Sequence, residues 1–210
     1  RGEGIFIQLD LDRVADWEKG IQSTALWQAH KDAHRRNFQR RFSETAQVVD
    51  PDSRMPEPRY WLLHTLAHAL IRKMAMQSGY GAASLTERIY AWSAAPGRDA
   101  AAGIFIGTTA SDSEGTLGGL VALAEPAKLG PLFISALRKA SRCSSDPVCA
   151  MRTPSDPEDF LHGAACHCCS FVSETSCEKA NRFLDRRLLL TLPNGTGSGI
   201  DGFFGGIRGE

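Results

Sequence analysis

The first 142 residues of this 210-residue chain contain no cysteine, and all six cysteines lie between positions 143 and 177. A secreted domain held together by disulfides spreads its cysteines through the fold. A chain of this length also buries enough core to be stable without such links. The bunched cysteines therefore favour a metal site over three disulfides or six unliganded thiols.

The chain also lacks a long apolar segment and a net charge. No apolar run approaches the 18 residues of a membrane-spanning helix, and the N-terminus carries no signal-like apolar region. We therefore expect a soluble, cytoplasmic protein with no membrane partner. Lys and Arg number 24, and Asp and Glu also number 24, so any contact with nucleic acid has to come from a local patch.

The rest of the sequence carries both strand and helix signals. Strands are expected at 4–10 and 103–110, and helices at 12–42, 59–78 and 126–142; residues 181–192 begin as helix and end as strand. The 59–78 helix is apolar on nearly all sides between Trp61 and Ala69, which predicts a central buried helix. Together these signals predict a mixed α/β (α+β) fold: a helix-rich body with a small sheet and a C-terminal four-cysteine zinc knot.

Residues 80–92 are harder to assign. Ser84 and Glu87 have the spacing of a capping box, which predicts that a helix begins near Ser84 and passes into a strand at 89–92.

The domain organisation follows from these elements. We expect a single zinc-binding domain over 1–192 with its metal knot at 143–177, followed by a flexible Gly-rich tail over 193–210. The chain begins with Arg1 rather than Met and enters a strand-like run at once, which is typical of the C-terminal part of a longer protein.

The cysteine spacing suggests most of a ligand set. Cys166 and Cys169 are separated by two residues, which lets both sulfurs face one ion, and Cys177 follows after a short turn as a third ligand. Of the adjacent pair Cys168 and Cys169, one is expected to be a bystander.

The spacing does not decide which residue is the fourth ligand. Cys149 is favoured over Cys143 because Asp146-Pro147 forms a turn that presents it, and His162 and His167 are in reserve. Zn²⁺ is the expected ion, since a closed site of four cysteines is the usual structural zinc site, and an iron–sulfur cluster is the alternative. Such a site has no open coordination position, so it predicts stabilisation rather than hydrolysis.

A basic stretch in the 12–42 helix is a candidate contact for nucleic acid or an acidic partner. Clustered guanidinium groups bind phosphate through paired hydrogen bonds, although a solvated helix face is the simpler interpretation. The stretch contains Lys31, Arg35, Arg36, Arg40 and Arg41.

A possible pocket involves two histidines and two acids. His64 and His68 lie one turn apart on a helix, as in zinc peptidases, but Thr65 stands where a peptidase needs its Glu. Satisfied core histidines are the simpler interpretation. Asp112 and Glu114 lie in a Gly-rich loop that lacks the Lys-Ser/Thr of a phosphate-binding Walker loop, and two carboxylates are a weak signal for Mg²⁺.

Several motifs occur in an order that resembles one family. They are Leu63-His-Thr-Leu-Ala-His-Ala-Leu70, Leu85-Thr-Glu-Arg-Ile-Tyr90, Ser111-Asp-Ser-Glu-Gly-Thr-Leu-Gly-Gly119, the Cys166–Cys169 pair after His162-Gly-Ala-Ala165, Glu174-Thr-Ser-Cys-Glu178 and Asn181-Arg-Phe-Leu-Asp-Arg186. Together they resemble the zinc-binding domain at the C-terminus of MrfA-type helicases, and in particular the helicase-partner subunits of the DISARM anti-phage system.

This resemblance implies a non-catalytic domain that associates with a superfamily 2 helicase and helps it engage DNA. It also implies four zinc ligands: Cys149, Cys166, Cys169 and Cys177. Two other functions stay open. One is a metal-dependent hydrolase or nuclease built on the histidines and acids above, and the other is a pure protein-interaction scaffold.

Overall fold

The computed structural model describes residues 2–41, 49–109, 118–154, 161–192 and 200–207, with the backbone alone for Arg41. Within these ranges, no helix has both the length and the apolar character that are needed to cross a membrane.

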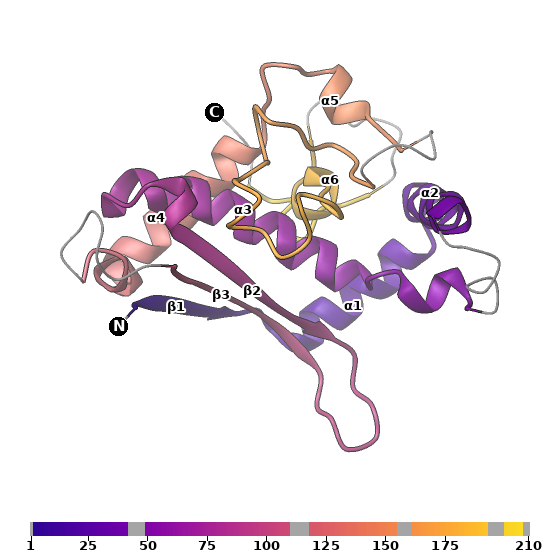
Figure 1. Ribbon diagram of the computed structural model, residues 1–210, viewed down its shortest axis with the longest axis horizontal. Helices are drawn as coiled ribbons and strands as arrows, with labels where there is room; N and C mark the ends of the chain where they lie inside the picture. Colours follow the sequence, from indigo (N-terminus) through magenta and orange to yellow (C-terminus); the bar gives the residue numbers. More distant parts are fainter. Residues whose placement is uncertain (1, 42–48, 110–117, 155–160, 193–199, 208–210) are drawn as a thin grey trace.

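The described elements form a helix-rich body with one small sheet, which confirms the expected fold class (Figure 1). The α-helices are α1 (Leu11–Gln22), α2 (Ala25–Arg41), α3 (Pro58–Ser78), α4 (Pro126–Ala140), α5 (Val148–Met151) and α6 (Arg186–Leu189). The strands are β1 (Gly4–Gln8), β2 (Leu85–Trp92) and β3 (Ala101–Thr108), and short 3-10 turns occur at Pro51–Arg54, Ala82–Ser84 and Val121–Ala124.

Helix α3 is the centre of the molecule, as its composition predicts. Every residue from Pro58 to Ile71 is buried, because the sheet packs on one side of the helix and the C-terminal segment on the other (Figure 1). Pro58 occupies its first turn, where the missing N–H costs nothing, and Gly79 ends it with a φ of 79° that favours glycine.

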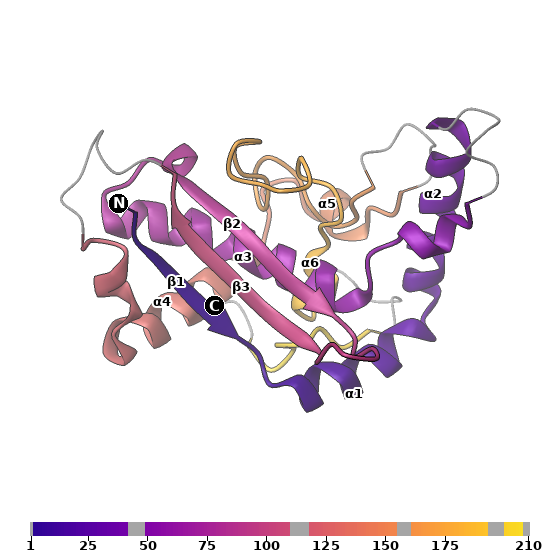
Figure 2. The same cartoon turned by 60° about the horizontal axis from the view of Figure 1, so that its bottom comes forward.

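The sheet has the order β1-β3-β2 with both pairs antiparallel (Figure 2). Residues 85–92 are a strand rather than the start of a helix, so the capping-box prediction is wrong at this site. The segment pairs with β3 along its whole length, from Leu85 opposite Thr108 to Trp92 opposite Ala101. Leu85 and Glu87 alternate with more exposed neighbours, which is the period of a strand and not of a helix.

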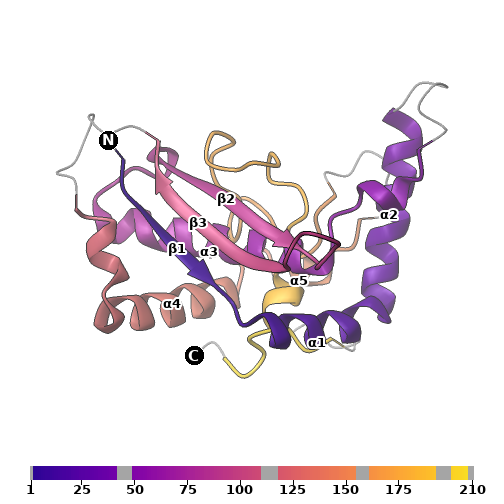
Figure 3. The same cartoon turned by 90° about the horizontal axis from the view of Figure 1, so that it is seen from below.

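The predicted 12–42 helix is two helices. Ser23 and Thr24 turn their hydroxyl groups back to the carbonyls of Gly20 and Ile21, and α1 ends there. Thr24 then accepts a hydrogen bond from the amide of Trp27, so it caps the start of α2. Helix α2 therefore leaves α1 at an angle and extends away from the sheet (Figure 3).

The C-terminal segment has little regular structure but is packed. Ile200 and Phe203 are buried, and the Phe203 and Phe204 amides donate to the carbonyls of Leu188 and Leu189. The described part of the Gly-rich tail is therefore held on the body, unlike the flexible tail that its glycine content predicts. Two bulky aromatic side chains bury enough apolar surface to offset the backbone freedom of the glycines.

A buried charge network joins α2, α3 and the C-terminal segment. Asp185 is fully buried and accepts hydrogen bonds from His30 at 2.8 Å and from the Arg187 guanidinium at 2.7 and 2.9 Å. Its amide donates to the Thr65 hydroxyl of α3. Burial raises the pKa of Asp185, but the charge of Arg187 and the bond from His30 outweigh burial, so its pKa lies below the usual range.

The same network explains the glycine before the cysteine pair. A Cβ added at Gly163 would lie 2.0 Å from an oxygen of Asp185 and 2.6 Å from a nitrogen of Arg187. Only glycine lets the 161–166 loop approach this ion pair so closely.

We expect Asp185→Asn to lower the free energy of unfolding by about 3 kcal/mol or more, because Arg187 would keep a buried charge without its counter-ion. Chemical denaturation measures this. Asp16→Asn is the matched control, since Asp16 pairs with Lys19 on the surface with both side chains 76% exposed. That change is expected to cost less than about 1 kcal/mol. Equal losses for the two variants would contradict a stabilising role for the Asp185 network.

Candidate metal centre

Four cysteine sulfurs gather where α4, α5 and the 161–171 loop meet. Every pair of these atoms lies within 4.8 Å, and none of the cysteines forms a disulfide. The Sγ atoms of Cys143 and Cys166 are 3.5 Å apart, those of Cys166 and Cys169 are 3.7 Å apart, and those of Cys149 and Cys169 are 3.8 Å apart. We call this group the cysteine cluster; its members are Cys143, Cys149, Cys166 and Cys169.

The cluster departs from the expected ligand set at one position. Cys143 takes the place of Cys177, which lies in a different group of side chains. Helix α4 ends at Ala140 and delivers Cys143, whose amide donates to the Asp146 carboxylate. The 143–149 turn thus presents both of its cysteines, where sequence spacing suggested only one. Cys168 is exposed and outside the cluster, as expected of a bystander.

The spacing fits a tetrahedral zinc ion. Zinc binds thiolate sulfur at about 2.3 Å, so the four sulfurs around it lie about 3.8 Å apart. The three measured separations are within about 0.3 Å of that value, and four sulfurs complete a closed shell. His162 and His167 are outside the cluster, and both pack edge-on against the ring of Phe171.

Arg186 supplies positive charge beside the sulfurs. It is fully buried and donates to Cys149 Sγ at 3.4 Å, to Asp146 at 2.9 Å and to the carbonyls of Ala140 and Ala164. Four thiolates around one Zn²⁺ leave two negative charges, and Arg186 offsets part of this excess. The same side chain fixes the end of α4 and the loop before Cys166.

The thiols already differ in acidity. A hydrogen bond from Cys149 and the charge of Arg186 lower the pKa of Cys169 to about 5, although burial opposes this. The same bond raises the pKa of Cys149, whereas burial raises the pKa of Cys166 to about 11. Cys169 is therefore more acidic than Cys149 and Cys166. Binding of a cation at the centre favours ionisation of the others.

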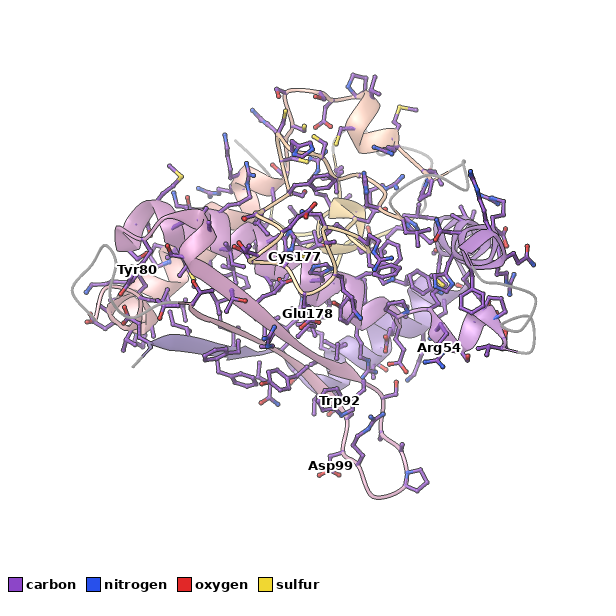
Figure 4. The ribbon with its side chains drawn as sticks, in the orientation of Figure 1. Arg54, Tyr80, Trp92, Asp99, Cys177 and Glu178 are labelled. Carbon is purple, nitrogen blue, oxygen red and sulfur yellow. The ribbon has the colours of Figure 1, made fainter. Side chains whose placement is uncertain are left out.

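A second group of side chains that could hold a metal ion lies where α3, β2 and the loop around Cys177 meet. All of its ligand atoms lie within 4.8 Å of one another, and every member is buried. Figure 4 shows Cys177 on the C-terminal loop that crosses α3. We call this group the histidine cluster; its members are His64, His68, Glu87 and Cys177.

The charges in the histidine cluster depend on one another. Burial raises the pKa of Glu87, but the charge and hydrogen bond of His64, together with His68, outweigh burial and lower its pKa to about 2. Burial lowers the pKa of His64, but the Glu87 carboxylate outweighs this and raises it. Among the described residues, the neighbours of His64 and His68 in this group are thus Glu87 and Cys177. Asp112 and Glu114 lie outside the described residues.

The basic stretch of α2 is partly neutralised. Lys31 lies 3.3 Å from a carboxylate oxygen of Asp52, and Arg35 donates two hydrogen bonds to the same carboxylate. Arg35 lowers the pKa of Asp52 to about 2 through these bonds. Arg36 donates to the carbonyl of Pro154 at 3.4 Å, and Arg40 is exposed near the end of the helix.

The described end of the Gly-rich loop has an internal ligand. The Glu3 carboxylate accepts hydrogen bonds from the amides of Gly118, Leu120 and Val121 and from the hydroxyl of Tyr80. A carboxylate of this chain therefore occupies the backbone donors that a phosphate group would use.

Two important residues were missed by sequence reasoning. Glu87 was assigned to a capping box, but a charged residue on the buried face of an alternating strand would have been a signal for a site. Arg186 stands in Asp185-Arg-Arg187, which looks like an ordinary surface run until burial is known.

We expect Cys143→Ser to remove one zinc ion per chain and to lower the melting temperature, because a hydroxyl group is a poor replacement for a thiolate ligand. Metal analysis by inductively coupled plasma mass spectrometry measures the loss. Cys168→Ser is the matched control and is expected to keep the wild-type zinc content, since Cys168 is exposed and outside the cluster. Full zinc retention in Cys143→Ser would show that Cys143 is no ligand.

We expect Arg186→Lys to weaken zinc binding about 10- to 100-fold, because lysine cannot reproduce the four hydrogen bonds around the sulfurs. Competition with a chromophoric chelator measures the affinity. Arg142→Gln removes an exposed charge close to the same site and serves as control. An equal loss of zinc affinity in both variants would show that Arg186 acts only through its charge and not through its hydrogen bonds.

Comparison with known proteins agrees with this chemistry. The MrfA Zn-binding domain family matches residues 66–170, a range that contains all four members of the cysteine cluster and stops short of Cys177. The DISARM protein DrmB of Bacillus paralicheniformis is 38% identical over 200 residues, which cover 90% of this chain and 31% of that protein. The chain thus spans about a third of the length of this relative. The matched residues make up half of the chain and carry the sulfur ligands that zinc requires, so the chain belongs to the MrfA Zn-binding domain family and its metal is Zn²⁺.

Proposed function

We propose that this chain is a non-catalytic, zinc-stabilised accessory module of an anti-phage defence system, and that it partners a DrmA-like superfamily 2 helicase and assists its engagement of DNA. The observation that carries the proposal is the 38% identity to DISARM protein DrmB over 90% of the chain. Identity at this level across nearly the whole chain supports a shared role in the same kind of assembly.

The chemistry of the cysteine cluster supports the absence of catalysis. Four sulfur ligands saturate a tetrahedral zinc ion, so no position is left for water or substrate. The proposed ligands are Cys143, Cys149, Cys166 and Cys169. Zinc at this place fastens α4, α5 and the 161–171 loop together.

The hydrolase alternative gains no support from the described residues. His64 and His68 are completely buried, whereas an active site needs access for substrate and water. The Glu87 carboxylate of β2 lies 3.0 Å from His64 and 3.5 Å from His68. The histidines thus belong to the interior of the domain.

We assign the DNA contact to the C-terminal half of α2. Lys31 and Arg35 already pair with Asp52, so they offer less charge to a phosphate group. Arg40 is exposed, and α2 projects from the body, where a nucleic acid can approach it (Figure 3). The proposed contact residues are Arg36, Arg40 and Arg41, with Lys31 and Arg35 holding the helix in place.

We expect the chain to co-purify with the superfamily 2 helicase encoded beside it and to raise the affinity of that helicase for DNA. Affinity capture followed by fluorescence anisotropy with labelled DNA measures both effects. Binding of the helicase without any change in DNA affinity would favour a pure interaction scaffold. The absence of helicase binding would refute the proposal.

We expect the triple variant Arg36→Glu, Arg40→Glu and Arg41→Glu to weaken DNA binding by the complex at least 10-fold and to flatten its dependence on salt, because fewer phosphate charges are neutralised. The matched control reverses three charges elsewhere: Lys73→Glu, Lys128→Glu and Lys139→Glu. This control tests whether net charge alone explains the loss. Equal losses in the two variants would contradict a specific contact on α2.

A further inference from the structure

The histidine cluster is the strongest feature that the proposed function leaves unused. Two imidazoles, a carboxylate and a thiol meet in the interior, with His64, His68 and Glu87 at 0% exposure and Cys177 at 8%. They come from α3, from β2 and from the C-terminal loop. Convergence of these four groups from three elements is unusual for a core, since buried titratable groups are costly without partners.

The hydrogen bond of His68 fixes its tautomer. Its Nδ1 lies 2.9 Å from the carbonyl oxygen of Ser170, which can only accept, so Nδ1 carries the hydrogen and donates it. In the neutral ring, Nε2 then carries a lone pair and can only accept a hydrogen bond. It faces Glu87 Oε1 at 3.5 Å without a hydrogen bond, and so two acceptors confront each other. A metal cation between the two atoms removes this conflict, as protonation of Nε2 also would.

The thiol of Cys177 is arranged as a thiolate ligand. It accepts hydrogen bonds from the amides of Lys179 at 3.4 Å and Asn181 at 3.2 Å, which stabilise negative charge on sulfur. His64 Nε2 lies 3.1 Å from this sulfur and 3.0 Å from Glu87 Oε1. Around a tetrahedral zinc ion, such ligand atoms lie about 3.3–3.6 Å apart. The cluster therefore needs only small adjustments to hold the ion.

Two further atoms have no partner in the described structure. Glu87 Oε2 and His64 Nδ1 are buried without a hydrogen bond. An unpaired carboxylate oxygen in a buried cluster is the kind of group that points to an ion.

We propose that the histidine cluster is a second zinc site, structural and separate from the cysteine cluster. Its ligands are His64, His68, Glu87 and Cys177. One carboxylate and one thiolate balance the charge of Zn²⁺, which suits a site with no access to solvent. The Ser170 carbonyl orients His68 from behind, as acceptors commonly do for zinc-bound imidazoles.

This site would join parts of the fold that the first zinc ion does not reach. It links α3 to β2 and to the loop around Cys177, whereas the cysteine cluster links α4 and α5 to the 161–171 loop. Ser170 contacts both, since its carbonyl accepts from His68 and its hydroxyl donates to Cys169 Sγ at 3.3 Å.

The zinc content of the whole wild-type chain is the first test, measured after dialysis against a weak chelator that strips adventitious metal. We expect two zinc ions per chain, one from each cluster. Glu87→Gln is expected to leave one. The matched control is Glu178→Gln, because Glu178 lies beside Cys177 and bonds to Tyr60 but is outside the cluster. This control should keep both ions.

Zinc X-ray absorption of the wild-type chain is the second test and needs no variant to fold. Over the two zinc ions together, we expect scattering from five sulfur ligands, four in the cysteine cluster and one from Cys177. The other three ligands are nitrogen or oxygen atoms, and the two histidines add the multiple-scattering pattern of imidazole. One zinc ion per chain with sulfur scattering alone would overturn the proposal. Retention of both ions by Glu87→Gln would overturn it as well.

Discussion

Ionised sulfurs 3.5–3.8 Å apart repel one another strongly, because a partly buried site screens charge poorly. A divalent cation at their centre turns this repulsion into attraction, and the positive charge of Arg186 adds to it. Apart from the hydrogen bonds of Arg186, the elements around the cluster are joined by short or irregular segments. Helix α5 is four residues long, and the 161–171 loop has no regular structure. We therefore expect zinc binding to the four cysteines to order this end of the molecule.

Buried ion pairs extend the same principle through the rest of the fold. Arg59 at the start of α3 bonds Glu18 of α1 through its amide and its guanidinium group, and both side chains are nearly inaccessible. Asp185 of the C-terminal segment likewise bonds His30 of α2 and Thr65 of α3. Desolvation opposes each pair, which is favourable only while both partners are present. The interior is thus specified by charge pairing as well as by the apolar surface of α3.

The sequence predicted the elements whose signals are local. The α3 and α4 helices and the existence of the β1 and β3 strands follow from apolar periodicity and from proline and glycine positions. Strand β1 ends two residues earlier than predicted, and β3 begins and ends two residues earlier. The strand at 85–92 was missed because Ser84 and Glu87 mimic a helix cap, and only pairing with β3 decides between the two. Strand pairing is a long-range property that local propensity does not contain.

The sequence predicted the type of metal site but not all of its ligands. Bunched cysteines indicate zinc from sequence alone, and Cys166 and Cys169 follow from their spacing. Whether Cys143 or Cys177 joins the cluster depends on where α4 ends and on which side of α3 the loop around Cys177 lies. Neither property can be read from the residues next to the cysteines. Cys177 lies instead beside His64 and His68, which sequence spacing had placed in a separate pocket.

The central claim is that Cys143, and not Cys177, completes the zinc site of the cysteine cluster. A crystal of the chain measured on both sides of the zinc absorption edge tests this most directly. We predict an anomalous peak about 2.3 Å from the sulfur atoms of all four members of the cysteine cluster. A zinc ion bound by Cys149, Cys166 and Cys169 with Cys177 as the fourth ligand, or no peak between the four sulfurs of the cysteine cluster, would contradict the claim.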